Sequence, residues 1–324
     1  MPLVSVVIPT YNSAKYLRET VSSIQKQEFS DYEIIIVDDK STDNTREVVE
    51  SCMGGNVRYF CLDTNHGGPS RARNVGIRKA RGRYVALCDS DDLWTSGHLK
   101  AAVDFLAREH VSMTFTDSRR FDDVSGRDLG RFLNGYNRFL NIPKRQVSDI
   151  CFVVASDDAF SCLFCENYIL PSGVVLSRDI FDDIGMFDES LTNGDDRDMW
   201  FRITREHNIG FISHAGFNYR VRSTSISNRG KVLAFNRIKV LKKQIESGLP
   251  VDLQKNALEL ISENYYNIGF SYQKEGEMRH ALSFYVQSLR ASRRNTYAAA
   301  KGILVALLGR NIYFFLQKQK KSVK

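Results

Sequence analysis

The chain has 324 residues, of which 43% are hydrophobic and 26% are charged, and its formal net charge is +7 at pH 7. This hydrophobic content excludes a disordered chain, and the length suits one large domain with an appendage. The positive charge favours anionic partners, which include nucleotides, nucleic acids and acidic membrane surfaces, but by itself it selects none of them.

The first 117 residues alternate short apolar runs with amphipathic stretches. The apolar runs predict strands at residues 4–8, 33–37, 57–62, 84–88 and 111–115. A helical pattern follows each of the first four runs, beginning after residue 12 and near residues 42, 69 and 98. This alternation predicts an α/β fold with a mostly parallel sheet covered by helices on both faces.

The pattern is less regular after residue 117. We expect long loops and short helices over residues 118–167, then a strand at 172–176, a helix at 178–184 and a strand pair near 209–221. From about residue 231 the apolar periodicity is helical and no strand pattern recurs. The sequence therefore predicts an α/β domain over residues 1–228 and an all-α appendage over residues 229–324.

Acidic residues follow two of the predicted strands. Asp38 and Asp39 follow the run at 33–37, and the sequence Asp-Ser-Asp-Asp at 89–92 follows the run at 84–88. Parallel strands bring their carboxyl ends to one edge of a sheet, where ligands bind. Carboxylates packed this closely repel one another and attract a hard divalent cation. We therefore predict a cation site at Asp89 and Asp91.

Other residues near these carboxylates suit a nucleotide. Tyr11 offers a ring for stacking on a base, and Asp39 offers an acceptor for a base N–H. Arg71 and Arg73 offer guanidinium groups to phosphates, although exposed helix arginines need no ligand. A cation at the 89–92 segment would bridge a diphosphate. Taken alone, the pair Asp38-Asp39 would favour a helix cap after a strand, and the other motifs in register favour the binding role.

Four segments, taken in order, resemble the family 2 glycosyltransferases, which are inverting enzymes of the GT-A fold that use nucleotide-activated sugars. Each segment is a weak motif alone, but their joint order and spacing are specific. The segments are residues 6–12 (Val-Val-Ile-Pro-Thr-Tyr-Asn), 36–43 (Ile-Val-Asp-Asp-Lys-Ser-Thr-Asp), 65–76 (Asn-His-Gly-Gly-Pro-Ser-Arg-Ala-Arg-Asn-Val-Gly) and 89–92.

The resemblance implies a role for individual residues. It divides the first domain into a nucleotide and metal half at 1–117 and an acceptor half at 118–228. Asp89 and Asp91 would hold Mg²⁺ or Mn²⁺ against the diphosphate. The resemblance implies that the nucleotide is bound by Pro9, Tyr11, Asp39, Arg71, Arg73 and Ser90.

The resemblance continues through residues 170–176 and 195–202, where Asp195 and Asp196 stand in place of the family's Glu-Asp pair. It assigns the general base to Asp196, which would deprotonate an acceptor hydroxyl. The carboxylates of Asp195 and Asp198 should raise the pKa of Asp196, and Arg197 should oppose them.

The chain departs from the family pattern at two positions. Many members carry a histidine after the segment at 219–221, whereas this chain has Arg222. A guanidinium can meet phosphates but cannot ligate a metal. Lys40 stands where small or amide residues are common, and it also fits a solvated charge.

The C-terminal residues carry a helical pattern of their own. Tyr265, Ile268-Gly269, Tyr272, Ala281 and Tyr285 fall at the offsets of one tetratricopeptide-like hairpin, although an ordinary helical hairpin fits equally. One such unit cannot bury its own apolar face, so we expect it to pack on the catalytic domain, on a protein partner or on a second copy.

Two apolar runs, at 302–308 and 312–316, are too short to span a membrane. Cations follow them, and this pattern predicts peripheral contact with an anionic membrane. The cations are Lys318, Lys320, Lys321 and Lys324. The chain opens without a signal-peptide pattern, so we expect a cytoplasmic protein that is also peripheral at the inner face of the cell membrane.

The function predicted from the sequence is inverting, metal-dependent sugar transfer from a nucleotide-sugar, taken as a UDP-sugar, to a hydroxyl of a glycan or lipid-linked acceptor. The expected context is synthesis of a cell-surface polysaccharide or glycoconjugate, with no nucleic-acid partner. One alternative is a nucleotidyltransferase, although residues 9–12 are not a glycine-rich phosphate loop. The other is a non-catalytic GT-A-like scaffold that binds a partner through its C-terminal helices.

Overall fold

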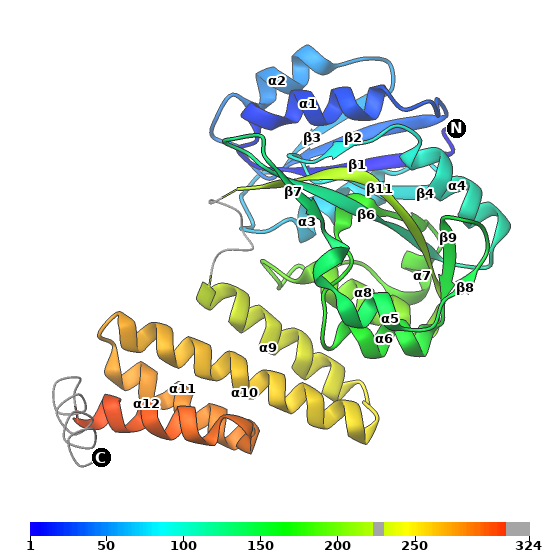
Figure 1. Cartoon of the computed structure of the whole chain (residues 1–324). Coiled ribbons are helices and arrows are strands. Elements are labelled where there is room, and N and C mark those ends of the chain that lie inside the picture. Colours follow the sequence, from blue (N-terminus) through cyan, green and yellow to red (C-terminus); the bar gives the residue numbers. More distant parts are fainter. Residues whose placement is uncertain (223–229, 309–324) are drawn as a thin grey trace. The chain divides into compact units, whose positions relative to one another are not determined.

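The computed structural model describes residues 1–222 and 230–308 (Figure 1). The chain forms two compact units, Met1–Thr224 and Ser225–Lys324. The sequence predictions that concern residues 223–227 and 312–324 lie outside the described residues.

The first unit is built on a sheet of eleven strands, in the order β3-β2-β1-β4-β10-β6-β11-β9-β8, with β5 paired to β11 and β7 paired to β6. The strands are β1 (Val4–Thr10), β2 (Tyr32–Asp38), β3 (Val57–Cys61), β4 (Tyr84–Leu87), β5 (Leu93–Trp94), β6 (Met113–Asp122), β7 (Asp128–Arg131), β8 (Arg145–Gln146), β9 (Cys151–Val154), β10 (Val174–Ser177) and β11 (Ile209–Val221).

Helices cover the sheet and make up the second unit. Those of the first unit are α1 (Ala14–Gln25), α2 (Thr45–Cys52), α3 (Ser70–Lys79), α4 (His98–Arg108), α5 (Asn137–Asn141), α6 (Ser156–Leu163), α7 (Ile180–Ile184) and α8 (Asp195–Glu206). Those of the second unit are α9 (Gly230–Glu246), α10 (Val251–Lys274), α11 (Met278–Ala291) and α12 (Thr296–Leu308).

The parallel core confirms the fold class predicted from the sequence. β1 pairs in parallel with β2 and β4, and β2 pairs in parallel with β3. Every residue of β1 is buried, as expected for a strand covered on both faces. Figure 1 shows α1 and α2 on one face of these strands and α3 on the other.

The close approach of α3 to the sheet depends on a glycine. A Cβ on Gly76 would lie 2.4 Å from a methyl carbon of Val7, so a larger residue would push α3 away from β1. Successive side chains of a strand alternate between its two faces, and that of Val7 lies on the face covered by α3. This packing positions the next feature of interest, the side chain of Arg73, which lies one helical turn before Gly76.

The region from 118 to 167 differs from the expected loops and short helices. β6 continues to Asp122, and β7, β8, β9 and α6 form within this region. The segment at 209–221 is one long strand with register shifts near Ala215, rather than a strand pair. β6 and β9 both pair with β11, which lies far along the sequence, and β7 and β8 pair in turn with β6 and β9.

The helices of the second unit pack through small residues. Ala281, Tyr285 and Ala299 form one buried cluster of this unit, in which small side chains lie beside the Tyr285 ring. A Cβ on Gly269 would lie 3.0 Å from the Tyr285 ring, so the glycine lets α10 and α11 approach closely. The hairpin of α10 and α11 exists, whereas its kinship with tetratricopeptide repeats stays a prediction. Among the described helices, none has the length and apolarity needed to cross a membrane.

One buried histidine makes the stability of the first unit depend on pH. His98 begins α4, is fully buried, and packs on Trp94 with 4.6 Å between ring centroids. Neither of its ring nitrogens has a hydrogen-bond partner. Burial, assisted by the nearby His214, lowers the pKa of His98 to about 3. The folded protein therefore keeps this ring neutral.

We expect acid to unfold the protein partly through His98. An unfolded histidine has a pKa of about 6.5, so below that pH the unfolded chain binds a proton that the folded chain does not. The stability contributed by neutral His98 is complete above pH 6.5 and falls by about 1.4 kcal/mol per pH unit as the pH drops towards 3. His98→Leu should remove this slope in urea unfolding measured from pH 7 to 4.

The matched control is His110→Leu, at an exposed position after the same helix. It should keep the full slope of the free energy of unfolding against pH. An unchanged slope in the His98 variant would contradict the assignment.

Candidate active site

The site lies at the carboxyl edge of the parallel strands. β1, β2 and β4 run in the same direction, so the residues that follow them gather at one edge. Tyr11 follows β1, Asp39 follows β2 and the segment 89–92 follows β4 soon after Leu87. The acidic residues identified in the sequence therefore meet at one edge.

Arg73 joins two acidic segments of the site. Its Nη2 donates to Asp89 Oδ1 at 2.7 Å, and its Nη1 donates to Asp195 Oδ2 at 2.7 Å. The arginine side chain is only 4% exposed. A planar guanidinium suits this geometry because its N–H groups point to two carboxylates at once. Arg73 thereby ties the segment after β4 to the start of α8.

Asp196, the predicted general base, follows directly after Asp195 and is partly buried. Burial raises the pKa of Asp196 to about 6, the charge of Asp195 adds to the increase, and the Arg73 guanidinium opposes it. The backbone N–H of Arg197 donates to Asp196 Oδ1 at 2.7 Å. The sequence had not identified Arg73 as the opposing cation. The side chain of Arg197 instead donates from Nε to the carbonyl of Leu163 at 3.1 Å.

Asp39 is buried and already has partners in the chain. Its Oδ2 accepts from the backbone N–H of His66 at 2.9 Å, and its Oδ1 lies 3.0 Å from His66 Nδ1. His66 has no role among the sequence predictions, although it lies inside the 65–76 motif. Asp38 has a different role, because it accepts from Ser41 Oγ at 2.6 Å and from Tyr59 at 2.7 Å and so fixes the turn after β2.

Lys40 lies in the turn after β2. Its φ angle is 64°, in the left-handed region that residues other than glycine and asparagine rarely adopt. The residue is exposed, as expected for a solvated charge.

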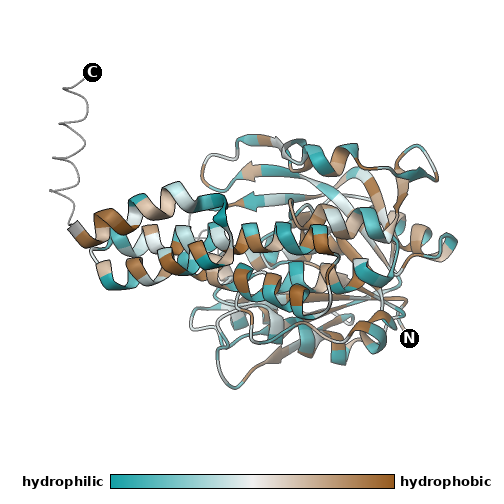
Figure 2. Cartoon of the chain, turned by 90° about the horizontal axis from the view of Figure 1, so that it is seen from below, coloured by the Kyte–Doolittle hydropathy of each residue, from teal (hydrophilic) through white to brown (hydrophobic). Residues whose placement is uncertain are grey.

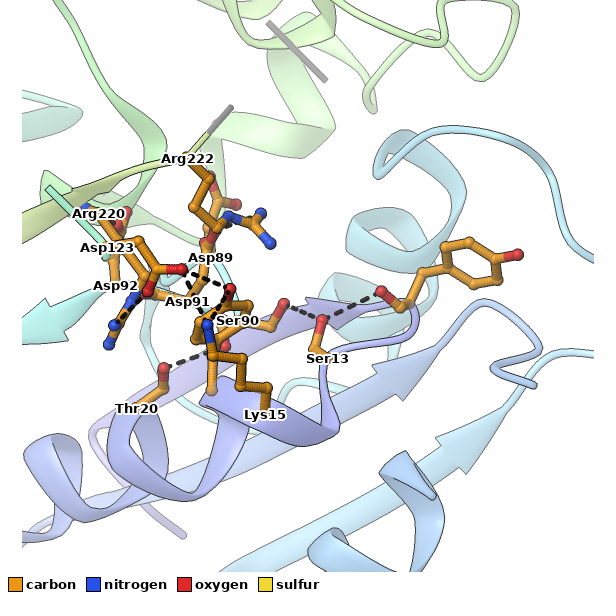
Figure 3. Close-up of polar contacts among 12 residues, drawn as sticks. Ser13, Lys15, Thr20, Asp89, Ser90, Asp91, Asp92, Asp123, Arg220 and Arg222 are labelled. Atoms are coloured by element: carbon orange, nitrogen blue, oxygen red, sulfur yellow. Dashed lines mark hydrogen bonds and ion pairs between the residues drawn. The ribbon is translucent and has the colours of Figure 1, made fainter. Parts of the chain in front are cut away.

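Arg222 forms an ion pair with the carboxylate of Asp91. Burial raises the pKa of Asp91 to about 6; Arg222 opposes this increase and Asp89 adds to it. Figure 3 shows Arg222 beside Asp89 and Asp91. The carboxylate of Asp92 points elsewhere: it is buried and accepts from Ser172 Oγ at 2.6 Å.

Further cations surround the acidic segment, and the sequence had not identified them as part of the site. Arg220 donates from Nε to the carbonyl of Asp91 at 2.9 Å and pairs with Asp123 at 3.0 Å. Lys15 pairs with Asp123 at 3.0 Å (Figure 3). Arg220 and Lys15 also lie over the ring of Tyr16, at 4.8 and 4.7 Å from its centroid.

The remaining predicted residues occupy different surroundings. Pro9 is buried within β1, whereas Tyr11 is 47% exposed beyond the end of that strand. Ser90 Oγ lies 2.7 Å from Ser13 Oγ. Arg71 is exposed on α3 and lies 3.5 Å from Glu189, so its recorded contact is outside the acidic segment.

The carboxylates fit a cation that is shared with a substrate. Among the described residues, no group of three or more His, Cys, Asp or Glu side chains gathers closely enough to hold a metal alone. Asp89 and Asp91 provide two carboxylates after one strand, and Mg²⁺ is usually held by one or two carboxylates together with substrate phosphates. A cation at Asp91 would compete with Arg222 for its carboxylate.

Comparison with known proteins supports the family suggested by the motifs. Residues 5–162 match the model of glycosyl transferase family 2. Residues 5–162 of the chain belong to glycosyl transferase family 2. This family membership decides between the enzyme classes considered above in favour of the glycosyltransferase.

Relatives of this glycosyltransferase include glycosyltransferase GlyG of Streptococcus pneumoniae, which is 28% identical over 80% of this chain and 84% of that protein. The Escherichia coli glucosyltransferase WfgD is 27% identical over 87% of this chain and 96% of that protein. TarS of Staphylococcus aureus is 42% identical over 39% of this chain, but the matched segment covers only 22% of TarS.

Solved structures share the fold of the glycosyltransferase. A crystal structure of TarS residues 1–349 with UDP-GlcNAc has a TM-score of 0.62 at 21% identity and covers 96% of this chain and 88% of that one. A mannosyltransferase of Pyrobaculum calidifontis with GDP-Man and Mn²⁺ has a TM-score of 0.58 at 18% identity, covering 98% and 84%. These likenesses confirm the GT-A fold.

We expect the stability of the glycosyltransferase to depend on the Arg73 bridge. Arg73→Met would leave the buried Asp195 without its counter-charge and should lower the free energy of unfolding by about 3–5 kcal/mol. Arg73→Lys should lower the free energy of unfolding by less, because an ammonium keeps the positive charge. Some loss should remain, because an ammonium has no planar fork to reach both carboxylates. Urea unfolding of the variants measures both losses.

Arg78→Lys is the matched control, since Arg78 is an exposed arginine of the same helix. It should change the free energy of unfolding by less than about 0.5 kcal/mol. A loss for Arg73→Met no larger than for this control would show that the bridge contributes nothing to stability.

Proposed function

We propose that this glycosyltransferase transfers a sugar from a UDP-sugar to a hydroxyl of a glycan or lipid-linked acceptor, with inversion at the anomeric carbon. The observation that carries the proposal is the Arg73 bridge. It links Asp89, at the predicted diphosphate site, to Asp195, which precedes the predicted base Asp196. One buried side chain would thus contact both the segment proposed to bind the leaving diphosphate and the segment that carries the proposed base.

The names of the relatives support the donor and the biological context. WfgD is named as a glucosyltransferase that uses UDP-Glc and acts on a GlcNAc-diphosphoundecaprenol. TarS is named as a poly(ribitol-phosphate) N-acetylglucosaminyltransferase, and its structures include complexes with UDP-GlcNAc and UDP. For this chain we infer a UDP-sugar donor and a role in synthesis of a cell-surface polysaccharide or glycoconjugate.

The nucleotide end of the proposed site uses the ends of β1 and β2. Tyr11 would stack on the base, with Pro9 shaping the turn beneath it. Asp39 would accept a base N–H, and its contacts with His66 fix the direction of the carboxylate in advance. Such preorganisation reduces the entropy lost on binding.

The diphosphate end of the proposed site uses the segment after β4. Asp89 and Asp91 would hold Mg²⁺ or Mn²⁺, which when bound would neutralise charge on the departing nucleotide. Ser90 and Arg71 are assigned to nucleotide contacts from the motif alone. Arg222 is held beside the same carboxylates and provides a positive charge for the phosphates.

Asp196 would act as general base in the transfer. Its carboxylate would take the proton from the acceptor hydroxyl while the hydroxyl oxygen forms a bond to the anomeric carbon. The bond from that carbon to the diphosphate oxygen breaks, and its electrons leave with the nucleotide. A pKa of about 6 keeps Asp196 mostly ionised near pH 7 yet basic enough to accept a proton.

We expect Asp196→Asn to lower the transfer rate by about 10²- to 10⁴-fold, the usual contribution of a general base. In the unaltered enzyme the rate should fall about tenfold per pH unit below pH 6, because protonation removes the base. UDP release from a UDP-sugar with mixed glycan acceptors measures the rate, and calorimetry with UDP should give a nearly unchanged Kd.

Asp104→Asn, at an exposed position of α4, serves as the control and should keep the full rate and pH profile. Normal turnover by the Asp196 variant would refute the assignment of the base.

A thermal-shift series tests the donor and the cation. UDP at about 100 times its Kd should stabilise the protein by about 2.7 kcal/mol, and Mn²⁺ should increase the shift. Asp91→Ala should abolish the Mn²⁺-dependent part while the shift with UDP alone persists. If no nucleotide in the screen shifts the melting temperature, the proposed donor site is contradicted. If the shift with UDP is the same with and without Mn²⁺, the cation site is contradicted.

A further inference from the structure

The positive charge of the chain lies in its second unit. Residues 1–224 contain 27 Lys and Arg against 32 Asp and Glu, a net charge of −5. Residues 225–324 contain 18 against 6, a net charge of +12, and the two parts add to the +7 of the chain. The catalytic unit is therefore acidic overall, and the helical unit is strongly basic.

One face of α12 is apolar and faces solvent. The opposite face packs on α11, where a Cβ on Gly302 would lie 2.5 Å from the Tyr285 ring. Tyr297, Leu304 and Leu307 are 83%, 47% and 64% exposed. Their spacing of seven and three residues puts them on one side of a helix. Figure 2 shows apolar residues on this helix, the last one described.

Exposed cations lie on α12 and shortly before it in the sequence. Lys301 is exposed on α12 itself, between Tyr297 and Leu304 in sequence. Arg290 is exposed at the end of α11, and Arg293 is exposed in the 3₁₀ turn Arg293–Asn295 that leads into α12. Apolar side chains bordered by Lys and Arg are typical of helices that lie in the interface of an anionic bilayer.

We propose that α12 docks the enzyme on the surface of a membrane that contains anionic lipids. Tyr297, Leu304 and Leu307 enter the boundary between headgroups and acyl chains, and Arg290 and Arg293 contact lipid phosphates. The apolar run at 302–308 is too short for a span, so the described part of α12 would lie along the surface. A lipid-linked acceptor would be found at this surface, although the proposal does not depend on the donor or acceptor.

Charge favours a bilayer over a second copy as the occupant of this face. Pairing two copies through α12 would bring together two units that each carry +12, and like charges repel. Anionic lipids instead complement the cations, each of which adds about 1 kcal/mol to binding near the surface. The same charge predicts that salt weakens the interaction.

The experiment is flotation of the full chain with vesicles of phosphatidylglycerol and phosphatidylcholine, compared with vesicles of phosphatidylcholine alone. We expect binding to the anionic vesicles, at least tenfold weaker binding to the neutral ones, and release by salt. Arg290→Gln with Arg293→Gln should weaken binding about fivefold for each charge removed. Leu304→Ser with Leu307→Ser should weaken it by at least about tenfold, because apolar burial drives insertion.

Leu140→Ser is the matched control, because Leu140 is 46% exposed in the first unit and Leu304 is 47% exposed. It should float like the unaltered protein, and circular dichroism should show that every variant keeps its helices. The proposal is overturned if the full chain ignores anionic vesicles, or if the Leu304 and Leu307 variant binds them normally. It is also overturned if the unaltered protein is a dimer by light scattering, the Leu304 and Leu307 variant is a monomer, and neither binds vesicles.

Discussion

The buried guanidinium of Arg73 holds together two acidic segments that would otherwise repel each other. Asp89 follows β4 and Asp195 begins α8, and neither would keep its position against the other without a cation between them. The position of Arg73 depends in turn on the close contact of α3 with β1 at Gly76. The packing of a single helix thus determines the spacing of the carboxylates and, through the nearby charge, the proton affinity of Asp196.

The site carries its own counter-ions. Asp89 pairs with Arg73, which it shares with Asp195, and Asp91 pairs with Arg222, while Arg220 lies against the backbone of the same segment. The chain's own cations therefore offset this concentrated negative charge, and they lie around the place proposed for a diphosphate. Binding a nucleotide with a metal ion becomes an exchange of ionic partners, which costs less than burying new charge in an empty pocket.

The parallel half of the fold was predictable because its signals are local. Each strand is a short apolar run, and carboxylates follow two of these runs within a few residues. The strands at 113–122 and 151–154 were only partly recognised or missed, because both depend on pairing with β11. The same limit applies to the site: the partner of Arg73 lies 122 residues away at Asp195, and no local pattern identifies that pair.

The order of strands has a consequence for synthesis of the chain. β4 pairs with β1 on one side and with β10 on the other, and β10 also separates β4 from β6. While the chain emerges from the ribosome, the edge of β4 destined for β10 stays open until residues 174–177 have appeared. An apolar strand with a bare edge invites pairing with other chains. The nascent protein therefore passes through a stage at which a chaperone covering this edge would protect it from aggregation.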